Sequence, residues 1–406
     1  MTPGPTRPGP TTNRAPRAST ASAPAASTPD APADAPVAVV VEGGDGSDGS
    51  DGGRAPDDGI AASADLLWEA VAAGEEPAAT AVVTQGLDAG LDPERVLLDV
   101  IARVQARVGE EWMADRFTVA QEHAATAINE RVVGVLARHR SAARTGPHRG
   151  RITVACIDGE WHALPARLLA EVLKLRGWRV DYLGAQVPTP HLIAHLHRTA
   201  TDAVALSASI PTRLPAAHAA ITACQAVGVP VIVGGAAFGA DGRYARLLGA
   251  DAWAPDARTA AEDLGRGGPA APRPDHQVID DLPHLADQEY TLVTRARTRL
   301  VAAVFAGLEE SYPALRSYSE EQRERTAEDL AHITEFLAAA LYTGDEELFT
   351  DFLLWTAEVL TARGVPAMSL PPALTLLGQE LQDFPRATAL LRTATDLLVT
   401  RHRKAR

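Results

Sequence analysis

An alternation of short apolar runs with segments of helical periodicity, over residues 151–264, constrains the fold of this chain more than any other feature. Parallel strands need a crossover between them, usually a helix, so this alternation is typical of a parallel sheet covered by helices. It predicts a doubly wound, Rossmann-like (flavodoxin-like) α/β domain over residues 150–265. The expected strands lie at residues 152–157, 179–183, 203–207, 230–235 and 250–254.

The residues before this domain have the periodicity of helices alone. Asp92 and Pro93 form a strong helix start, because an aspartate caps the first turn and proline favours the first helical position. Apolar residues then recur every three or four positions over residues 96–108. With the other helices, this predicts a four-helix bundle over residues 61–145. The other helices are expected near residues 65–73, 80–89 and 118–140.

The remaining segments differ sharply in composition. Residues 1–60 hold ten of the 29 prolines and an acidic Gly/Ser run, so we expect a disordered tail that buries too little apolar surface to fold. Residues 266–280 are a Gly/Pro-rich linker. Residues 281–406 are helical again and contain most of the aromatic residues, which predicts an all-α domain. This domain could have a globin-like fold, or it could serve simply as a dimerisation module.

The composition excludes several classes of protein. Lys and Arg number 38 against 52 Asp and Glu, a formal net charge of −14, which argues against the basic surface of a nucleic-acid-binding body. Two cysteines, Cys156 and Cys224, cannot form a disulfide-rich scaffold or a cysteine-clustered zinc site. No apolar run approaches the roughly 18 residues of a membrane helix, and no signal-peptide pattern opens the chain. We expect a cytoplasmic protein without a membrane or direct nucleic-acid partner.

Glu160 and His162 come directly after the first expected strand. Ligands of an open α/β sheet bind at the carboxyl ends of its strands, so this loop lies where a ligand would bind. A carboxylate that accepts the proton on one imidazole nitrogen leaves the other nitrogen suited to a metal ion. The plain alternative is a solvated loop histidine.

Small residues end the third and fourth expected strands, namely Ser207, Ser209, Gly234 and Gly235. Hydroxyl groups and bare glycine backbone at two neighbouring strand ends would leave a deep slot for a flat or elongated ligand. Together with the Glu–His pair, these residues resemble the motif of cobalamin (vitamin B12) binding domains. That motif has an acidic residue and a histidine two positions apart, then a serine motif and a Gly–Gly pair.

This resemblance implies a role for each residue of the motif. His162 would replace the base of the cofactor as the lower axial ligand of cobalt, and Glu160 would be its hydrogen-bond partner. The two serines and two glycines would line the slot for the nucleotide tail. The chain departs from the family at Pro165, where the motif has glycine. Proline is tolerated there if Pro165 lies in the first turn of the following helix.

A tryptophan and a Glu–His pair lie in the expected bundle, at Trp112, Glu122 and His123. A bundle followed by an α/β domain, with residues of this kind at this spacing, resembles the adenosylcobalamin photoreceptors of the light-responsive repressor type. The resemblance implies that these three residues cap the upper face of the cofactor, over the adenosyl group. Those repressors often have a histidine directly after the tryptophan, where this chain has Met113. No helix-turn-helix pattern precedes the bundle, so direct repression of DNA is not expected.

The order of bundle, cobalamin domain and aromatic-rich helical domain resembles the photocobilins, in which a C-terminal domain binds the bilin biliverdin. Tyr318 and His332 could hydrogen-bond such a bilin, and Arg325 could pair with a propionate. Binding would be non-covalent, because no cysteine follows Cys224. For His332, a heme ligand and a buried structural histidine are the alternatives.

These observations favour a non-enzymatic light sensor that binds adenosylcobalamin and biliverdin. Loss of the adenosyl group in light would change the conformation or the oligomeric state, and the output would pass to a homo-oligomer or to a downstream protein. One alternative is a corrinoid methyl carrier of a methyltransferase system. The other is a signalling scaffold without a cofactor.

Overall fold

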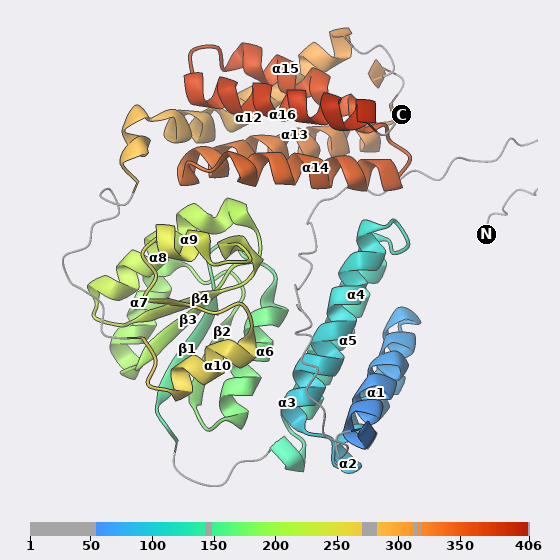
Figure 1. Ribbon diagram of the computed structural model, residues 1–406, viewed down its shortest axis with the longest axis vertical. Coiled ribbons are helices and arrows are strands. Elements are labelled where there is room, and N and C mark those ends of the chain that lie inside the picture. Colours follow the sequence, from blue (N-terminus) through green and yellow to red (C-terminus); the bar gives the residue numbers. More distant parts are fainter. Residues whose placement is uncertain (1–53, 143–147, 270–281, 312–314, 317, 405–406) are drawn as a thin grey trace, which may run out of the picture.

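The computed structural model contains a helical bundle, a five-stranded α/β domain and a C-terminal helical domain, in the order expected from the sequence (Figure 1). It describes residues 54–142, 148–269, 282–311, 315–316 and 318–404. The expected tail up to residue 53 and most of the expected linker lie outside the described residues. The predicted fold class, mostly helical with one parallel sheet, is confirmed.

The first part is a bundle that begins earlier than expected. Its first helix starts at Arg54 rather than after residue 60, because Ile60 is buried in the bundle core and extends the helix into the expected tail. The side chain of Asp92 accepts a hydrogen bond from the backbone N–H of Arg95, which confirms the predicted cap. The bundle helices are α1 (Arg54–Ala72), α2 (Glu76–Asp88), α3 (Pro93–Arg95), η1 (Val96–Ile101), α4 (Ala102–Met113) and α5 (Val119–Leu136).

The segments α3, η1 and α4 follow one another without a break and form one long helix with an irregular centre. The segment η1 is a π-helix, and the N–H of Ala102 donates to the carbonyl of Leu97, five residues earlier. Such a segment holds one more residue per turn than an α-helix and often lies at a functional site. It lies on the side of the bundle that faces the α/β domain.

The second part is a sheet of five parallel strands in the order β2-β1-β3-β4-β5. This is the flavodoxin-like order, in which the chain changes direction between β1 and β3. The strands are β1 (Arg151–Cys156), β2 (Arg179–Gly184), β3 (Ala203–Ser207), β4 (Val231–Gly234) and β5 (Ala252–Trp253). The helices are α6 (Ala163–Leu175), α7 (Thr189–Thr199), α8 (Leu214–Ala226), α9 (Arg243–Leu247) and α10 (Ala257–Gly265).

Alternate residues of the strands enter two different cores. On β3, Ala203 and Ala205 belong to a core shared with α6, α10 and the bundle. Val204 and Leu206 belong to a core shared with α8 and the C-terminal helical domain. Because successive side chains of a strand point to opposite faces, one face of the sheet packs toward the bundle and the other toward the C-terminal domain. In Figure 1 the C-terminal helices lie above both other parts.

The third part consists of helices, as expected for residues 281–406, and glycine and proline mark several of their ends. Gly344 ends one of them with a positive φ of 70°, and Pro385 begins the last. The helices are α12 (Glu289–Ser311), α13 (Glu320–Thr343), α14 (Glu346–Ala362), α15 (Leu370–Glu380) and α16 (Pro385–Lys404), with the short turns η5 (Pro283–Asp287) and η7 (Ala367–Ser369).

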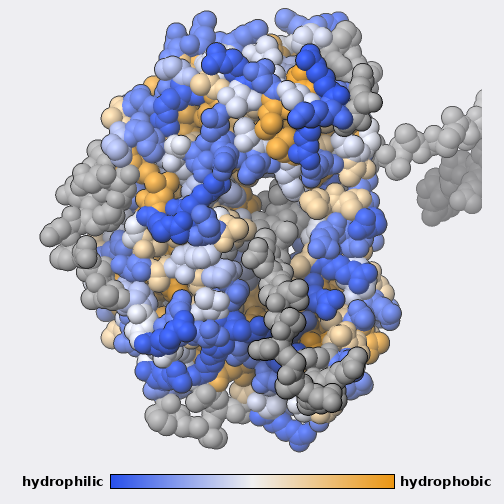
Figure 2. All heavy atoms as spheres, in the orientation of Figure 1, coloured by the Kyte–Doolittle hydropathy of each residue, from blue (hydrophilic) through white to orange (hydrophobic). Residues whose placement is uncertain are grey.

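The face shown in Figure 2 is mostly hydrophilic, and its apolar residues form small separate patches. Within the described ranges, no helix combines the length and the apolar character that crossing a membrane requires.

Candidate functional site

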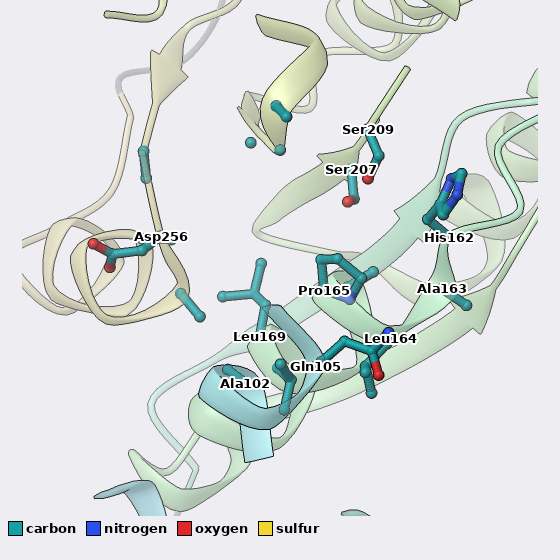
Figure 3. A pocket seen from close by; sticks show the side chains of 18 of the residues that line it. Ala102, Gln105, His162, Ala163, Leu164, Pro165, Leu169, Ser207, Ser209 and Asp256 are labelled. Carbon is teal, nitrogen blue, oxygen red and sulfur yellow. The ribbon is translucent and has the colours of Figure 1, made fainter. Parts of the chain in front are cut away.

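A cavity of about 1090 Å³ opens between the bundle and the carboxyl ends of the strands. It takes residues from the loops after β1, β3, β4 and β5, and from α4, α5 and η1 of the bundle. Figure 3 shows Ser207, Ser209 and His162 on one side of this cavity and Asp256 on the other. The loops after β1 and β3 flank the point where the strand order reverses, the usual ligand position in such sheets.

Glu160 and His162 form a tightly bonded pair at the edge of the cavity. His162 Nδ1 lies 2.6 Å from Glu160 Oε1, and the same oxygen accepts from the backbone N–H of His162 at 2.9 Å. The other carboxylate oxygen accepts from the backbone N–H groups of Ser209 and Ile210, at 2.6 and 3.2 Å. With both oxygens engaged, Glu160 holds the His162 ring against the loop that follows β3.

Electrostatics favour the ionised form of this carboxylate. Glu160 is 0% exposed, and this burial alone would raise its pKa. The hydrogen bonds and charge of His162, with the backbone N–H of Ser209, outweigh burial and hold the pKa below its usual range. An ionised carboxylate on Nδ1 favours the ring tautomer whose Nε2 carries a lone pair, which is the form that binds a metal.

The serines and glycines of the motif all line the cavity. Ser207 and Ser209 are buried at the end of β3. Gly235 has a φ of +99°, and a Cβ atom there would lie 2.3 Å from the carbonyl oxygen of Ala208. A side chain at position 235 would therefore displace the loop after β3. The glycine is needed for this close approach as well as for an open slot.

Pro165 lies in the first turn of α6 and lines the cavity. The first N–H groups of a helix have no partner within the helix, so the proline removes no hydrogen bond there. The departure from the family motif at this position therefore leaves the helix intact.

Glu122 and His123 line the bundle side of the same cavity. Their side chains meet, with His123 Nδ1 3.0 Å from Glu122 Oε2 and 2.9 Å from the carbonyl oxygen of Val119. The Glu122 side chain is largely covered, whereas that of His123 is 62% exposed. The structure thus brings the Glu–His pair of the bundle and the Glu160–His162 pair of the sheet to one cavity.

Trp112 is placed elsewhere and is not among the residues that line the cavity. Its side chain is 1% exposed and stacks on Trp355 of α14, with ring centroids 6.3 Å apart. The Arg363 guanidinium lies 4.6 Å from the centroid of the Trp112 ring and 3.7 Å from the carboxylate of Asp115. Met113 is partly exposed and does not line the cavity either.

The sequence analysis missed other lining residues. Gln105 belongs to them, on the same helical face as Leu98 and Ala102, which precede it by seven and three positions. Asp256 and Arg258 come from the loop and helix after β5. The sequence could have indicated Asp256 and Arg258, because they follow the fifth expected strand. The carboxyl ends of parallel strands all lie at the same edge of the sheet.

The three residues proposed for a bilin lie on or beside α13. Arg325 and His332 are seven positions apart and so share one face of the helix. Arg325 pairs with Glu321 at 2.6 Å. Tyr318 lies just before the helix and packs against the core of the C-terminal domain. Phe336, one turn beyond His332, stacks on Phe352 of α14 with centroids 3.7 Å apart.

The cavity residues fit a large ligand that carries a metal. Drug-sized ligands occupy cavities of about 300–1,000 Å³, so a cavity of about 1090 Å³ suits a larger molecule. An imidazole whose Nδ1 is held by a carboxylate is a ligand for a transition metal such as cobalt. The glycine backbone of β4 and the serine hydroxyls of β3 leave room for a polar chain beside it.

Comparison with protein families assigns the two halves of this site. Residues 150–264 and residues 64–137 each match a family model described as a B12 binding domain. The repressor CarH from Myxococcus xanthus, named an HTH-type transcriptional repressor, is 33% identical over 169 residues. This match covers 40% of the chain and 54% of the relative. The HTH-type transcriptional repressor CarA from the same organism is 35% identical over 128 residues, 30% of the chain and 42% of the relative.

Solved structures with a similar part include the monomethylamine corrinoid protein of Methanosarcina barkeri. It is 18% identical with a TM-score of 0.46, and the match covers 51% of this chain and 99% of that protein. A cobalamin-binding protein from Desulfitobacterium hafniense DCB-2 is 20% identical with a TM-score of 0.29, over 51% of this chain and 97% of that one. Both TM-scores are below 0.5, too low to establish a shared overall fold.

The chain spans about half the length of the curated relatives that it matches. The matched domains end at residue 264, so the resemblance of the C-terminal domain to a bilin-binding domain stays a prediction. For the bundle and the α/β domain, the expected cobalamin-binding domains are confirmed by these matches. The chain therefore contains a two-part B12-binding region and is similar, over part of its length, to the repressors CarH and CarA.

Proposed function

We propose that this chain is a non-enzymatic light sensor that holds adenosylcobalamin in the cavity between the bundle and the sheet. The bound cofactor would supply a cobalt–carbon bond that light can break. His162 would be the lower axial ligand and Glu160 would hold its ring in place. Ser207, Ser209 and the glycines after β4 would line the slot for the nucleotide tail.

The bundle would supply the upper side of the site. Glu122 and His123 face the cavity from α5, where the carboxylate can accept hydrogen bonds from ligand hydroxyl groups. Trp112 lies behind this surface, in contact with Trp355. Through this contact, Trp112 would couple the position of α4 to the C-terminal domain.

One observation carries the proposal. His162, held by the buried Glu160 after β1, lines the same cavity as Glu122 and His123 on α5, so each matched domain contributes to it. A ligand that fills this cavity contacts both domains, so a change in its upper group changes the best position of the bundle relative to the sheet. The output would then be a change in self-association or in contact with a downstream protein.

The proposal includes biliverdin bound without a covalent link in the C-terminal domain. Arg325 would pair with a propionate, while Tyr318 and His332 would hydrogen-bond the bilin. Two features of α13 support it: the shared face of Arg325 and His332, and the stacked aromatic pair beside that face. A bilin there would extend the absorbed spectrum toward red light.

An absorption spectrum tests the proposal. The full chain is incubated with adenosylcobalamin and biliverdin, passed through gel filtration, and measured before and after green light. We expect cobalamin bands that change on illumination and a red bilin band that stays with the protein. His162→Ala should lose the histidine-ligated spectrum, whereas His191→Ala, at an exposed position on α7, should not.

The outcomes separate the alternatives. Cobalamin bands that do not respond to light would favour a methyl carrier. Absence of cobalamin from the eluted protein would overturn the proposal and favour a scaffold without a cofactor. Cobalamin bands without a bilin band would overturn the biliverdin assignment alone.

A further inference from the structure

A line of hydrogen-bonded side chains joins α4 to α5 beside the cavity and ends at Glu122. Asn129 Nδ2 donates to Gln105 Oε1 at 2.8 Å, and Gln105 Nε2 donates to Thr126 Oγ1 at 2.8 Å. The Thr126 hydroxyl donates to Glu122 Oε1, also at 2.8 Å. We call Gln105, Thr126 and Asn129 the Gln105 relay.

The charge of Glu122 sets the direction of every bond in the relay. A carboxylate only accepts hydrogen bonds, so the single hydroxyl proton of Thr126 is committed to Glu122. Thr126 can then only accept from Gln105, which turns the NH2 group of Gln105 toward it. The oxygen of Gln105 therefore faces Asn129, which must present its own NH2 group. All donors point toward the carboxylate.

Asn129 keeps this orientation at a local cost. It is 0% exposed, and within the described part of the chain its Oδ1 has no hydrogen-bond partner. Leaving a buried acceptor unpaired costs about 1–3 kcal/mol. Turning the amide round would place its oxygen against the oxygen of Gln105, two acceptors face to face. The relay is therefore fixed in one arrangement by the carboxylate at its end.

We propose that the Gln105 relay positions Glu122 as a fixed acceptor for paired hydroxyl groups on the upper ligand. The cavity would then favour a cobalamin that carries a nucleoside sugar over one that carries a small alkyl group. This inference rests on the proposed function, because it requires a cobalamin in the cavity. Gln105, Thr126 and Glu122 all line that cavity.

The chemistry of the two upper groups explains the preference. A sugar with two neighbouring hydroxyl groups offers two donors to a carboxylate, whereas a methyl group offers none. A carboxylate already held in position loses less conformational entropy when the ligand binds. Without the relay, the Glu122 side chain would adopt several rotamers, and the affinity gained from the sugar hydroxyl groups would fall.

Dissociation constants for adenosylcobalamin and methylcobalamin, measured in the dark on the full chain, test the relay. Thr126→Val removes the hydroxyl at almost constant volume. We expect it to raise the Kd of adenosylcobalamin about tenfold, as for loss of one charge-assisted hydrogen bond, and that of methylcobalamin less than about twofold. Gln105→Met should act in the same direction.

Matched variants separate positioning from a merely structural effect. Thr126→Ser keeps the hydroxyl and should retain the preference for adenosylcobalamin. Thr84→Val removes a hydroxyl that bonds only within α2, to the carbonyl of Thr80, and should change neither Kd. In a Glu122→Gln background, Thr126→Val should have little further effect, because residues that act through one group are not additive.

Two results would overturn the relay while leaving the proposed function standing. One is equal weakening of both cobalamins by Thr126→Val and Gln105→Met, which would indicate a structural role. The other is unchanged affinity for both ligands. Failure of the unsubstituted chain to bind any cobalamin would instead overturn the proposed function, and the relay with it.

Discussion

The two faces of the sheet are joined to the rest of the molecule in different ways. On the α8 face, one continuous apolar core runs from the strands into the C-terminal domain. Inside it, His218 Nδ1 lies 2.9 Å from the hydroxyl of Tyr342, and both residues are buried. At its rim, the Tyr244 hydroxyl donates to Asp345 at 2.7 Å. We call this contact the solid junction.

On the α6 face, the sheet also shares a core with the bundle, but the cavity lies between them. On either side of the cavity, the bundle contacts another part of the molecule. At the start of the long helix, Glu94 pairs with Arg176 through two contacts of 2.6 and 2.9 Å. At its end, Trp112 stacks on Trp355 of the C-terminal domain. We call this contact the hollow junction.

The difference indicates which part of the molecule can move. Close-packed interiors deform little, so the α/β domain and the C-terminal domain should behave as one unit. The bundle faces the sheet across the cavity, so a ligand in the cavity bears directly on the position of the bundle. Three measurements would test this comparison.

His218→Ala should have the largest effect, because it opens a cavity in the solid junction and removes a partner of the Tyr342 hydroxyl. We expect the free energy of unfolding to fall by about 2–4 kcal/mol. Urea denaturation, followed by circular dichroism, would measure it. The exposed His191→Ala on α7 should change stability by less than about 0.5 kcal/mol. Equal stability of the two variants would refute the solid junction.

Trp355→Ala should loosen the hollow junction alone, with a smaller loss of about 1–2 kcal/mol, because it removes the stack on Trp112. Hydrogen exchange should rise about tenfold at the end of α4, at residues 105–113, and stay unchanged in α13. Arg363→Lys should raise the same exchange rates by a smaller factor. It keeps the positive charge near Asp115 but loses the flat guanidinium over the Trp112 ring. Faster exchange in α13 as well would contradict the division into two junctions.

Asp329→Asn should have the smallest effect, visible only at high pH. Burial, with the charge of Glu328, raises the pKa of Asp329 to about 7 against the opposing charges of Arg363 and Arg325. A raised folded-state pKa means that the unsubstituted chain loses stability as pH rises from about 4 to 7. The variant lacks this loss, so its Tm should exceed that of the unsubstituted chain by about 2–4 °C at pH 8 and match it at pH 4.

The control for this pH effect is Asp351→Asn, at an exposed position on α14. It should leave the difference between the two pH values unchanged. A Tm advantage of Asp329→Asn that is the same at both pH values would show that removal of the charge is not its cause.

Local patterns in the sequence were enough to predict much of the fold and half of the site. The period of the apolar residues defines the five strands, and parallel strands bring His162, Ser207 and Gly234 to one edge whatever the packing of the helices. The helix start at Asp92 depends on a few neighbouring residues, and it too was correctly predicted.

What could not be predicted depends on packing between distant segments. Trp112 faces Trp355, 243 positions later, and no pattern within either helix indicates this contact. Gln105 has the periodicity of a cavity-facing residue but no motif to mark it. The start of α1 at Arg54 was not predicted. The Pro- and Gly-rich composition of residues 1–60 indicated a disordered tail, and among the described residues of that segment only Ile60 is buried and indicates otherwise.

The π-helical segment η1 fits one extra residue into the long bundle helix. A π-helical turn holds about one residue more than a regular turn, so deletion of Leu98 would convert residues 96–101 to ordinary α-helix and leave α4 in its present rotational phase. Each residue of an α-helix advances by about 100°, so the same residues wound as α-helix without the deletion would rotate everything after them by about that angle. Gln105 would then turn away from the cavity and Trp112 away from Trp355. The wide turn of η1 therefore keeps both contacts in phase while the chain carries one residue more than a regular helix would need.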